Sequence, residues 1–93
     1  MKYPKYLREA IRMAFNVGMK QILESGRPHA NRMGQDRACN IAITSWALVE
    51  HTLSYNTQKR WAALSDQERE ELAREALPSV KYSWIPIPEE LDK

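Results

Sequence analysis

The chain has 93 residues, of which 43% are apolar and 28% charged, and its formal net charge at pH 7 is +2. This length allows one hydrophobic core and excludes two domains, because a chain this short buries only roughly 60% of its unfolded surface. Cys39 is the single cysteine, so an internal disulfide framework and a cysteine zinc finger are both excluded. We therefore expect one small soluble domain in a reducing, cytoplasmic compartment.

Membrane insertion is not expected. The longest apolar run covers residues 41–49 and is interrupted by Thr44 and Ser45, whereas a membrane span needs about 20 apolar residues. The first residues carry positive charge, but no uninterrupted apolar stretch follows as in a secretory leader.

The small net charge hides a gradient along the chain. Residues 1–37 hold eight basic and three acidic side chains, whereas residues 61–93 hold four basic and eight acidic ones. Such a polarised chain can attract an acidic partner at one end or associate head to tail. Alternatively, the two halves fold against each other and their charges meet mostly solvent.

The first helix is predicted over about residues 5–25. Pro4 suits a first helical turn, and Gly26 and Pro28 end the helix. Apolar residues recur every three to four positions, which is typical of an amphipathic helix; they are Leu7, Ile11, Ala14, Phe15, Gly18 and Ile22. The opposite edge carries Arg8, Arg12, Asn16 and Lys20. Met13, Val17 and Met19 widen the apolar surface, either as core filling or as an adaptable binding face.

The second helix is predicted over about residues 37–57, after a glycine- and proline-containing loop over 26–35. Asp36 can cap its first turn. Its apolar residues occupy more than one face, so we expect this helix at the centre of the fold. A buried strand over 41–49 is the competing interpretation, but the polar positions Asn40, Thr44 and His51 fit helical spacing better.

The third helix is predicted over about residues 66–77. Ser65 and Glu68 have the spacing of a capping box, in which each side chain bonds the other residue's amide. Acidic residues crowd its first turns, as the helix dipole favours, and Pro78 ends it. Its apolar content is thin, so we expect it to need help in closing the core.

The remaining residues, 79–93, are predicted to form an extended tail attached to a helical domain over 1–78. Val80, Tyr82 and Trp84 alternate with polar residues, and Ile85-Pro-Ile87-Pro favours extended or polyproline II backbone. The segment is too apolar to be a solvated tail. The predicted fold is therefore all-α, a compact three-helix domain with an extended C-terminal tail.

Catalytic motifs are missing from the sequence. Nucleotide-binding glycine patterns, a nucleophile elbow and HExxH are all absent, and His29 and His51 lack ligand-spaced carboxylate pairs. Cys39 is interpreted as a small buried apolar residue. We therefore expect a non-enzymatic protein with no cofactor and no metal.

Two features favour recognition. The first is a set of cations that suits carboxylates or phosphates, namely Arg27, His29, Arg32 and Arg37 around the loop with Arg8 and Arg12 on the first helix. The alternative is a solvated loop. The second feature is the tail, with Tyr82, Trp84, Ile85 and Ile87. It acts either as an intramolecular strap or as a clip on a partner or second protomer, since tryptophan and tyrosine are enriched at binding hot spots.

Together these patterns predict a small protein-interaction module, an adaptor or inhibitor that binds a protein partner through its basic loop and aromatic tail. By size alone, such modules are common among phage and mobile-element accessory proteins. One alternative is weak, backbone-directed nucleic-acid binding; the acidic third helix and the long first loop argue against a helix-turn-helix. The other alternative is a homo-oligomeric structural subunit such as a homodimer.

Overall fold

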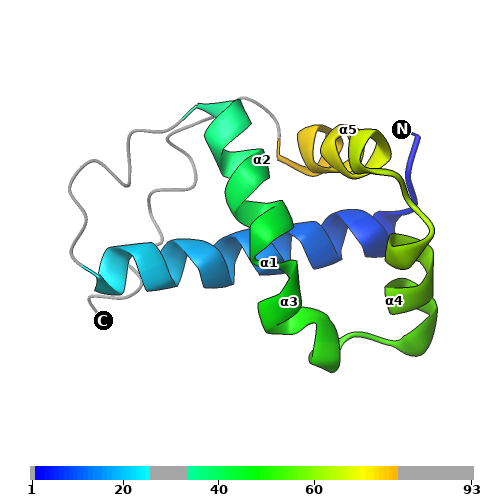
Figure 1. Cartoon of the computed structure of the whole chain (residues 1–93), viewed down its shortest axis with the longest axis horizontal. Helices are drawn as coiled ribbons and strands as arrows, with labels where there is room; N and C mark the ends of the chain where they lie inside the picture. The colour runs from blue at the N-terminus through cyan, green and yellow to red at the C-terminus, as the bar shows by residue number, and fades with distance from the viewer. Residues whose placement is uncertain (1, 26–33, 78–93) are drawn as a thin grey trace.

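The computed structural model describes residues 2–25 and 34–77 and shows an all-α globule, as predicted (Figure 1). The described residues form five α-helices, one short 3₁₀ helix and no strand. The elements are α1 (Lys5–Glu24), α2 (Gln35–Thr44), α3 (Trp46–Val49), η1 (Glu50–Thr52), α4 (Tyr55–Ala62) and α5 (Asp66–Ala76). None of these helices is long and apolar enough to cross a membrane.

The long helix α1 is the axis of the molecule. In Figure 1 it runs across the whole view, with α2 crossing it, α5 on one side and α3 and α4 on the other; all four helices contact it. Its apolar face supplies much of the core, through the fully buried residues Leu7, Ile11, Ala14, Phe15 and Met19. The expectation that the 37–57 segment lies at the centre is therefore wrong, because α1 is the helix on which the others pack.

Gly18 allows α1 and α2 to cross closely. A Cβ atom built on Gly18 would overlap the Ser45 Oγ and lie 2.7 Å from the Ile41 Cγ2. The absence of a side chain therefore lets the two backbones approach, and glycine here serves packing rather than a turn.

The predicted second helix is divided into four pieces. The Thr44 hydroxyl donates to the Asn40 carbonyl at 2.9 Å, a bond that competes with the helical ladder and bends helices. α2 ends there and the short elements α3 and η1 follow, until Leu53 adopts extended backbone with ψ 156°. Ser54 then accepts from the Thr57 amide and starts α4, a helix that the sequence analysis missed.

The start of α2 also differs from the prediction. α2 begins at Gln35 with Gly34 as its N-cap residue, and no side chain caps it. Asp36 lies inside the first turn and forms an ion pair with Arg74 of α5 at 2.6 Å. It thus joins two helices instead of capping one.

Two stacked indole rings connect α3 to α4. Trp46 of α3 and Trp61 of α4 lie with ring centroids 4.0 Å apart and planes inclined by 10°, and both are buried. The Arg69 guanidinium of α5 lies 4.7 Å from the Trp61 ring centroid and donates to the Trp61 carbonyl at 3.0 Å. This combination of stacking, cation–π contact and hydrogen bonding fixes α4 against α5.

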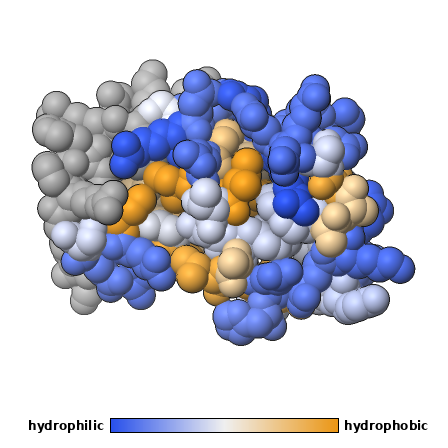
Figure 2. Space-filling view, viewed as in Figure 1, coloured by the Kyte–Doolittle hydropathy of each residue, from blue (hydrophilic) through white to orange (hydrophobic). Residues whose placement is uncertain are grey.

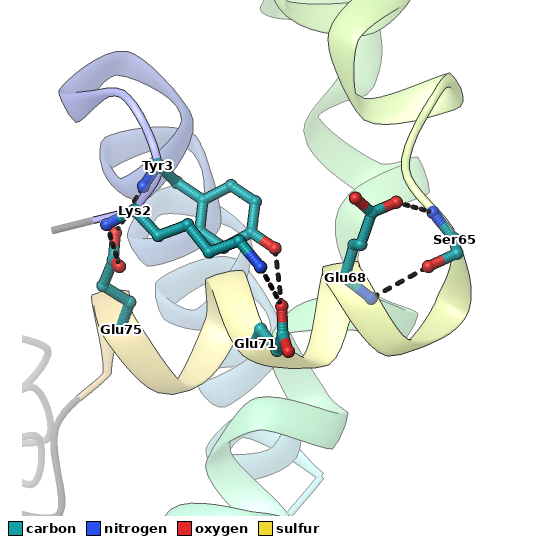
Figure 3. A network of polar contacts seen from close by, with 6 residues as sticks. All are labelled: Lys2, Tyr3, Ser65, Glu68, Glu71 and Glu75. Atoms are coloured by element: carbon teal, nitrogen blue, oxygen red, sulfur yellow. Dashed lines mark hydrogen bonds and ion pairs between the residues drawn. The ribbon is translucent and has the colours of Figure 1, made fainter.

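α5 has the predicted capping box, with the Ser65 amide 2.8 Å from the Glu68 carboxylate and the Glu68 amide 3.1 Å from the Ser65 hydroxyl (Figure 3). Its apolar side closes the core with buried residues Leu72, Ala73, Ala76 and Leu77. α5 has few apolar residues, but they are enough to form a buried contact, because the small side chains of Ala73 and Ala76 let α5 approach α1 and α2.

Lys2 and Tyr3, which precede α1, bind two glutamates of α5. Glu75 accepts from the amides of Lys2 and Tyr3 at 2.7 and 3.0 Å, one through each carboxylate oxygen (Figure 3). Glu71 accepts from the Lys2 ammonium at 3.0 Å and from the Tyr3 hydroxyl at 2.9 Å. Arg8 adds an ion pair with Glu75 at 3.7 Å. The basic front of the chain thus folds onto the acidic rear, where part of the charge gradient is neutralised.

Candidate protein-binding surface

Within residues 2–25 and 34–77, four large apolar side chains are exposed on α1, α3 and α4. They are Tyr6 and Met13 of α1, Leu48 of α3 and Tyr55 of α4, with exposed fractions of 36%, 44%, 42% and 78%. We call these four residues the apolar seam. The sequence analysis left open whether Met13 fills the core or forms a binding face, and the structure exposes it while burying Met19.

Two long-range contacts place the α1 members of the seam beside α4 and η1. The Asn56 amide donates to the Tyr6 hydroxyl at 3.4 Å, which places Tyr6 beside the first turn of α4. The Thr52 hydroxyl lies 3.9 Å from the Met13 sulfur, which places Met13 beside η1. Both contacts are long for hydrogen bonds.

Next to the seam, α1 carries an open depression of about 460 Å³, lined by Glu9, Arg12, Met13, Asn16 and Val17. We call these five residues the α1 depression. Met13 belongs to both surfaces, and the half-buried Val17 adds a second apolar side chain. Figure 2 shows apolar residues reaching the surface over α1 and α2 between hydrophilic margins.

The end of α5 is fixed at one edge of the α1 depression. The Arg12 Nε donates to the Ala76 carbonyl at 3.0 Å. The Gln35 amide donates to the next carbonyl, that of Leu77, at 3.0 Å and to the Arg74 carbonyl at 3.2 Å. Two side chains therefore hold the last turn of α5, and the chain leaves the described fold beside Arg12.

The cations predicted to bind an anion or an acidic surface have different environments. Arg8 donates to the Tyr3 carbonyl at 2.6 Å, and Arg12 holds the end of α5, so both are engaged inside the fold. Arg37 is exposed on α2. The loop cations Arg27, His29 and Arg32, and the tail residues Tyr82, Trp84, Ile85 and Ile87, lie outside the described residues. The structure therefore does not bring the six cations together in the part that it describes.

A second depression, of about 280 Å³, lies between α2 and α5 and is lined by Asp36, Cys39, Asn40, Ile43, Glu70 and Arg74. Arg74 pairs with Asp36 and Glu70 there, and the two carboxylates raise its pKa, Glu70 most strongly. Cys39 is buried, as predicted, and burial raises the pKa of its thiol to about 11. The charges in this depression are thus paired within the protein, and the thiol is protonated at neutral pH.

Metal-binding geometry is not found in residues 2–25 and 34–77, where no group of three or more His, Cys, Asp or Glu side chains is suitably placed. Comparisons with protein families, curated proteins and solved structures found no match to this chain.

Sequence reasoning missed the apolar seam because it depends on helix placement. Tyr55 was assigned to the end of a long helix, whereas it begins α4 and is 78% exposed. The signal that could have found this boundary is Ser54, three residues before Thr57, which has the spacing of an N-cap.

Proposed function

We propose that this protein is a small interaction module whose apolar seam binds another protein. The observation that carries the proposal is the exposure of four large apolar side chains on adjoining helices, Tyr55 the most at 78%. Large apolar side chains that gather at the surface mark binding sites in soluble proteins. Tyrosine and methionine are also enriched at protein interfaces, where they supply contact area that adapts in shape.

The proposed partner presents apolar side chains beside acidic ones. Lys5 lies next to Tyr6 in the sequence and is exposed, and Lys59 is exposed one helical turn after Tyr55. Lysines at the edge of an apolar contact favour a partner of opposite charge and speed its association. The loop cations named above stay part of this proposal as further contacts with the partner, and the aromatic tail contacts the partner only when it is not packed on the chain's own helices.

The test is affinity capture from the native host with the wild-type chain and with Y55E and M13E. Each substitution places a negative charge in the seam, so we expect the captured partner to be lost or strongly reduced. Q67E is the matched control, because it makes the same change in charge at an exposed position of α5. Circular dichroism spectra and melting temperatures should be compared first, so that a loss of binding is not a loss of folding.

The outcome that contradicts the proposal is equal capture of the same proteins by the wild type, Y55E and M13E. Light scattering during size exclusion separates the alternative in which the partner is a second copy of this chain. In that case the wild type elutes as a dimer and Y55E as a monomer. A salt titration with DNA tests the nucleic-acid alternative, for which binding should weaken steeply as salt rises.

A further inference from the structure

We propose that the α1 depression is the docking site for the C-terminal segment of this same chain, residues 80–87. Three observations carry this inference: the place where the chain leaves the fold, the length and pattern of the residues that follow, and the match of charges. The inference goes beyond the proposed function and does not depend on it. Partner binding by the seam is tested independently by Y55E, because Tyr55 does not line the α1 depression.

The chain leaves the described fold at the edge of the α1 depression. Arg12 lines the depression and also donates to the Ala76 carbonyl at 3.0 Å. Leu77 has φ −120° and ψ 78°, so the backbone has already left helical conformation there. Residues that follow Leu77 therefore start beside the depression, and reaching it costs little loop-closure entropy.

The length of the segment fits the distance to be covered. Val80 lies four positions after Ala76, and in extended backbone this separation spans about 13 Å. The diameter of a helix with its side chains is about 10–12 Å, so Val80 can reach Met13 from the Arg12 side. The eight residues 80–87 then span more than the two turns of α1 that line the depression.

The alternation of side chains fits a one-sided contact. Val80, Tyr82 and Trp84 share one face of an extended segment, because successive side chains point to opposite sides. That face meets the exposed Met13 and half-buried Val17. Methionine sulfur packs favourably against aromatic rings, so Tyr82 and Trp84 are suited to cover Met13.

The charges are also complementary. Glu89, Glu90 and Asp92 follow the apolar part of the segment. Exposed lysines stand one turn beyond the depression at both ends, Lys5 before Glu9 and Lys20 after Asn16. Whether the segment runs parallel or antiparallel to α1, the acidic residues that follow it therefore end near an exposed lysine.

Docking of this kind covers Met13, which the depression shares with the apolar seam. The tail and an external partner then compete for part of the same surface. The partner that the seam is proposed to bind, apolar and acidic, has the same chemistry as the tail itself.

The test uses disulfide formation in the full chain. N16C places a thiol on the rim of the depression, and V80C places one on the face of the tail that meets α1. The matched control combines V80C with K59C, another exposed position but on α4. Because a flexible tether alone gives an effective concentration near millimolar, the rates of the two pairs must be compared. We expect an intrachain bond to form about tenfold faster or more with N16C than with K59C.

Two further arms keep the test decisive. In 8 M urea the K59C pair should react faster, because it closes the shorter loop, and adding W84A to the N16C/V80C chain should reduce its rate in native buffer to that of the control. All of these chains carry C39A, because Cys39 is buried in native buffer but becomes reactive in urea. Equal rates for the two pairs in native buffer would overturn the inference. So would a bond that forms mainly between chains, which would assign the depression to the tail of a second copy.

Discussion

Arg12, in the middle of α1, donates through its Nε to the carbonyl of Ala76, the last residue of α5, at 3.0 Å. The bond connects residues 64 positions apart in the sequence. It satisfies one of the carbonyl groups that the end of a helix leaves without a partner. It also fixes the place where the chain leaves the fold.

Replacing Arg12 with Ala should destabilise the protein by about 1–3 kcal/mol, because a charge-assisted hydrogen bond is lost and a helix-end carbonyl loses its partner. Urea denaturation followed by circular dichroism measures this change. Arg37→Ala is the matched control, since Arg37 is exposed on α2, and it should change stability by less than about 0.5 kcal/mol. Equal effects of the two substitutions would contradict a structural role for Arg12.

Gly18→Ala should destabilise the crossing of α1 and α2. The added methyl group would overlap the Ser45 hydroxyl and crowd Ile41, so the helices must separate, at a cost of about 1–3 kcal/mol. The higher helix propensity of alanine, worth about 1 kcal/mol in a helix interior, opposes this cost. A net loss in thermal stability is expected, and a stabilised G18A protein would show that the helices cross less closely.

The control for G18A is a second glycine substitution, Gly34→Ser. Gly34 is the N-cap residue of α2, with φ −89° and ψ −178°, and a Cβ there meets nothing within 4 Å. Serine adopts this conformation readily and can accept from an amide of the first turn. G34S should therefore be neutral or stabilise by a few tenths of a kcal/mol.

Stability should fall in acid because of Glu75. Burial alone raises the pKa of Glu75, but the amides of Lys2 and Tyr3 and the Arg8 guanidinium outweigh it and hold the pKa below its ordinary value of 4.5. A group with a lowered pKa in the folded state stabilises the fold above its unfolded pKa and loses this effect as pH falls through the folded pKa. Glu71 acts in the same direction, since hydrogen bonds from Lys2 and Tyr3 lower its pKa.

Melting temperatures measured between pH 7 and pH 2 check this expectation. The wild type should lose stability below about pH 4.5, and Glu75→Gln should be less stable at pH 7 and show a shallower decline. Glu24→Gln is the control, because Glu24 is the last residue of α1 and Lys2 and Tyr3 precede the first. It should follow the wild-type curve. A Glu75→Gln curve parallel to that of the wild type would show that the contacts of Glu75 with Lys2 and Tyr3 do not stabilise the fold.

Cys39 should react slowly with thiol reagents. The thiolate is the reactive form, and burial raises the pKa of this thiol to about 11 while leaving only 2% of the residue exposed. Alkylation by iodoacetamide at pH 8, followed by mass spectrometry, should therefore be much slower in native buffer than in urea. Equal rates would show that α2 and α5 separate readily in solution.

Local sequence signals predicted α1 and α5 correctly, because residues within or next to each helix mark its end or its buried face. Ser65 and Glu68 marked the start of α5, and the apolar spacing from Leu7 to Ile22 marked α1 and its buried face. The 37–57 region was mispredicted because its apolar residues do not lie on one face of a helix, so their spacing does not show where the helix breaks. There the break depends on a hydroxyl of Thr44 that bonds the backbone and on the extended conformation of Leu53.

The candidate surface was harder to predict than the helices. The sequence analysis grouped Arg8 and Arg12 with the loop cations, because residues four apart share a helix edge. The structure shows that α5 packs along this edge and uses both side chains, a long-range contact that periodicity does not reveal. Leu48 and Met13 look like core residues in sequence, and only the placement of the helices exposes them.

The proposed docking of the tail on α1 is tested most directly by nuclear Overhauser effects on the Met13 methyl group in the full chain, labelled with ¹³C at its methionine methyls. If residues 80–87 occupy the α1 depression, the Met13 methyl shows cross-peaks to ring protons of Tyr82 or Trp84, and these vanish in W84A and Y82A variants. The buried Met19 methyl keeps its cross-peaks in all of these proteins. A Met13 methyl with no contact to either ring, in a folded protein, would contradict the account.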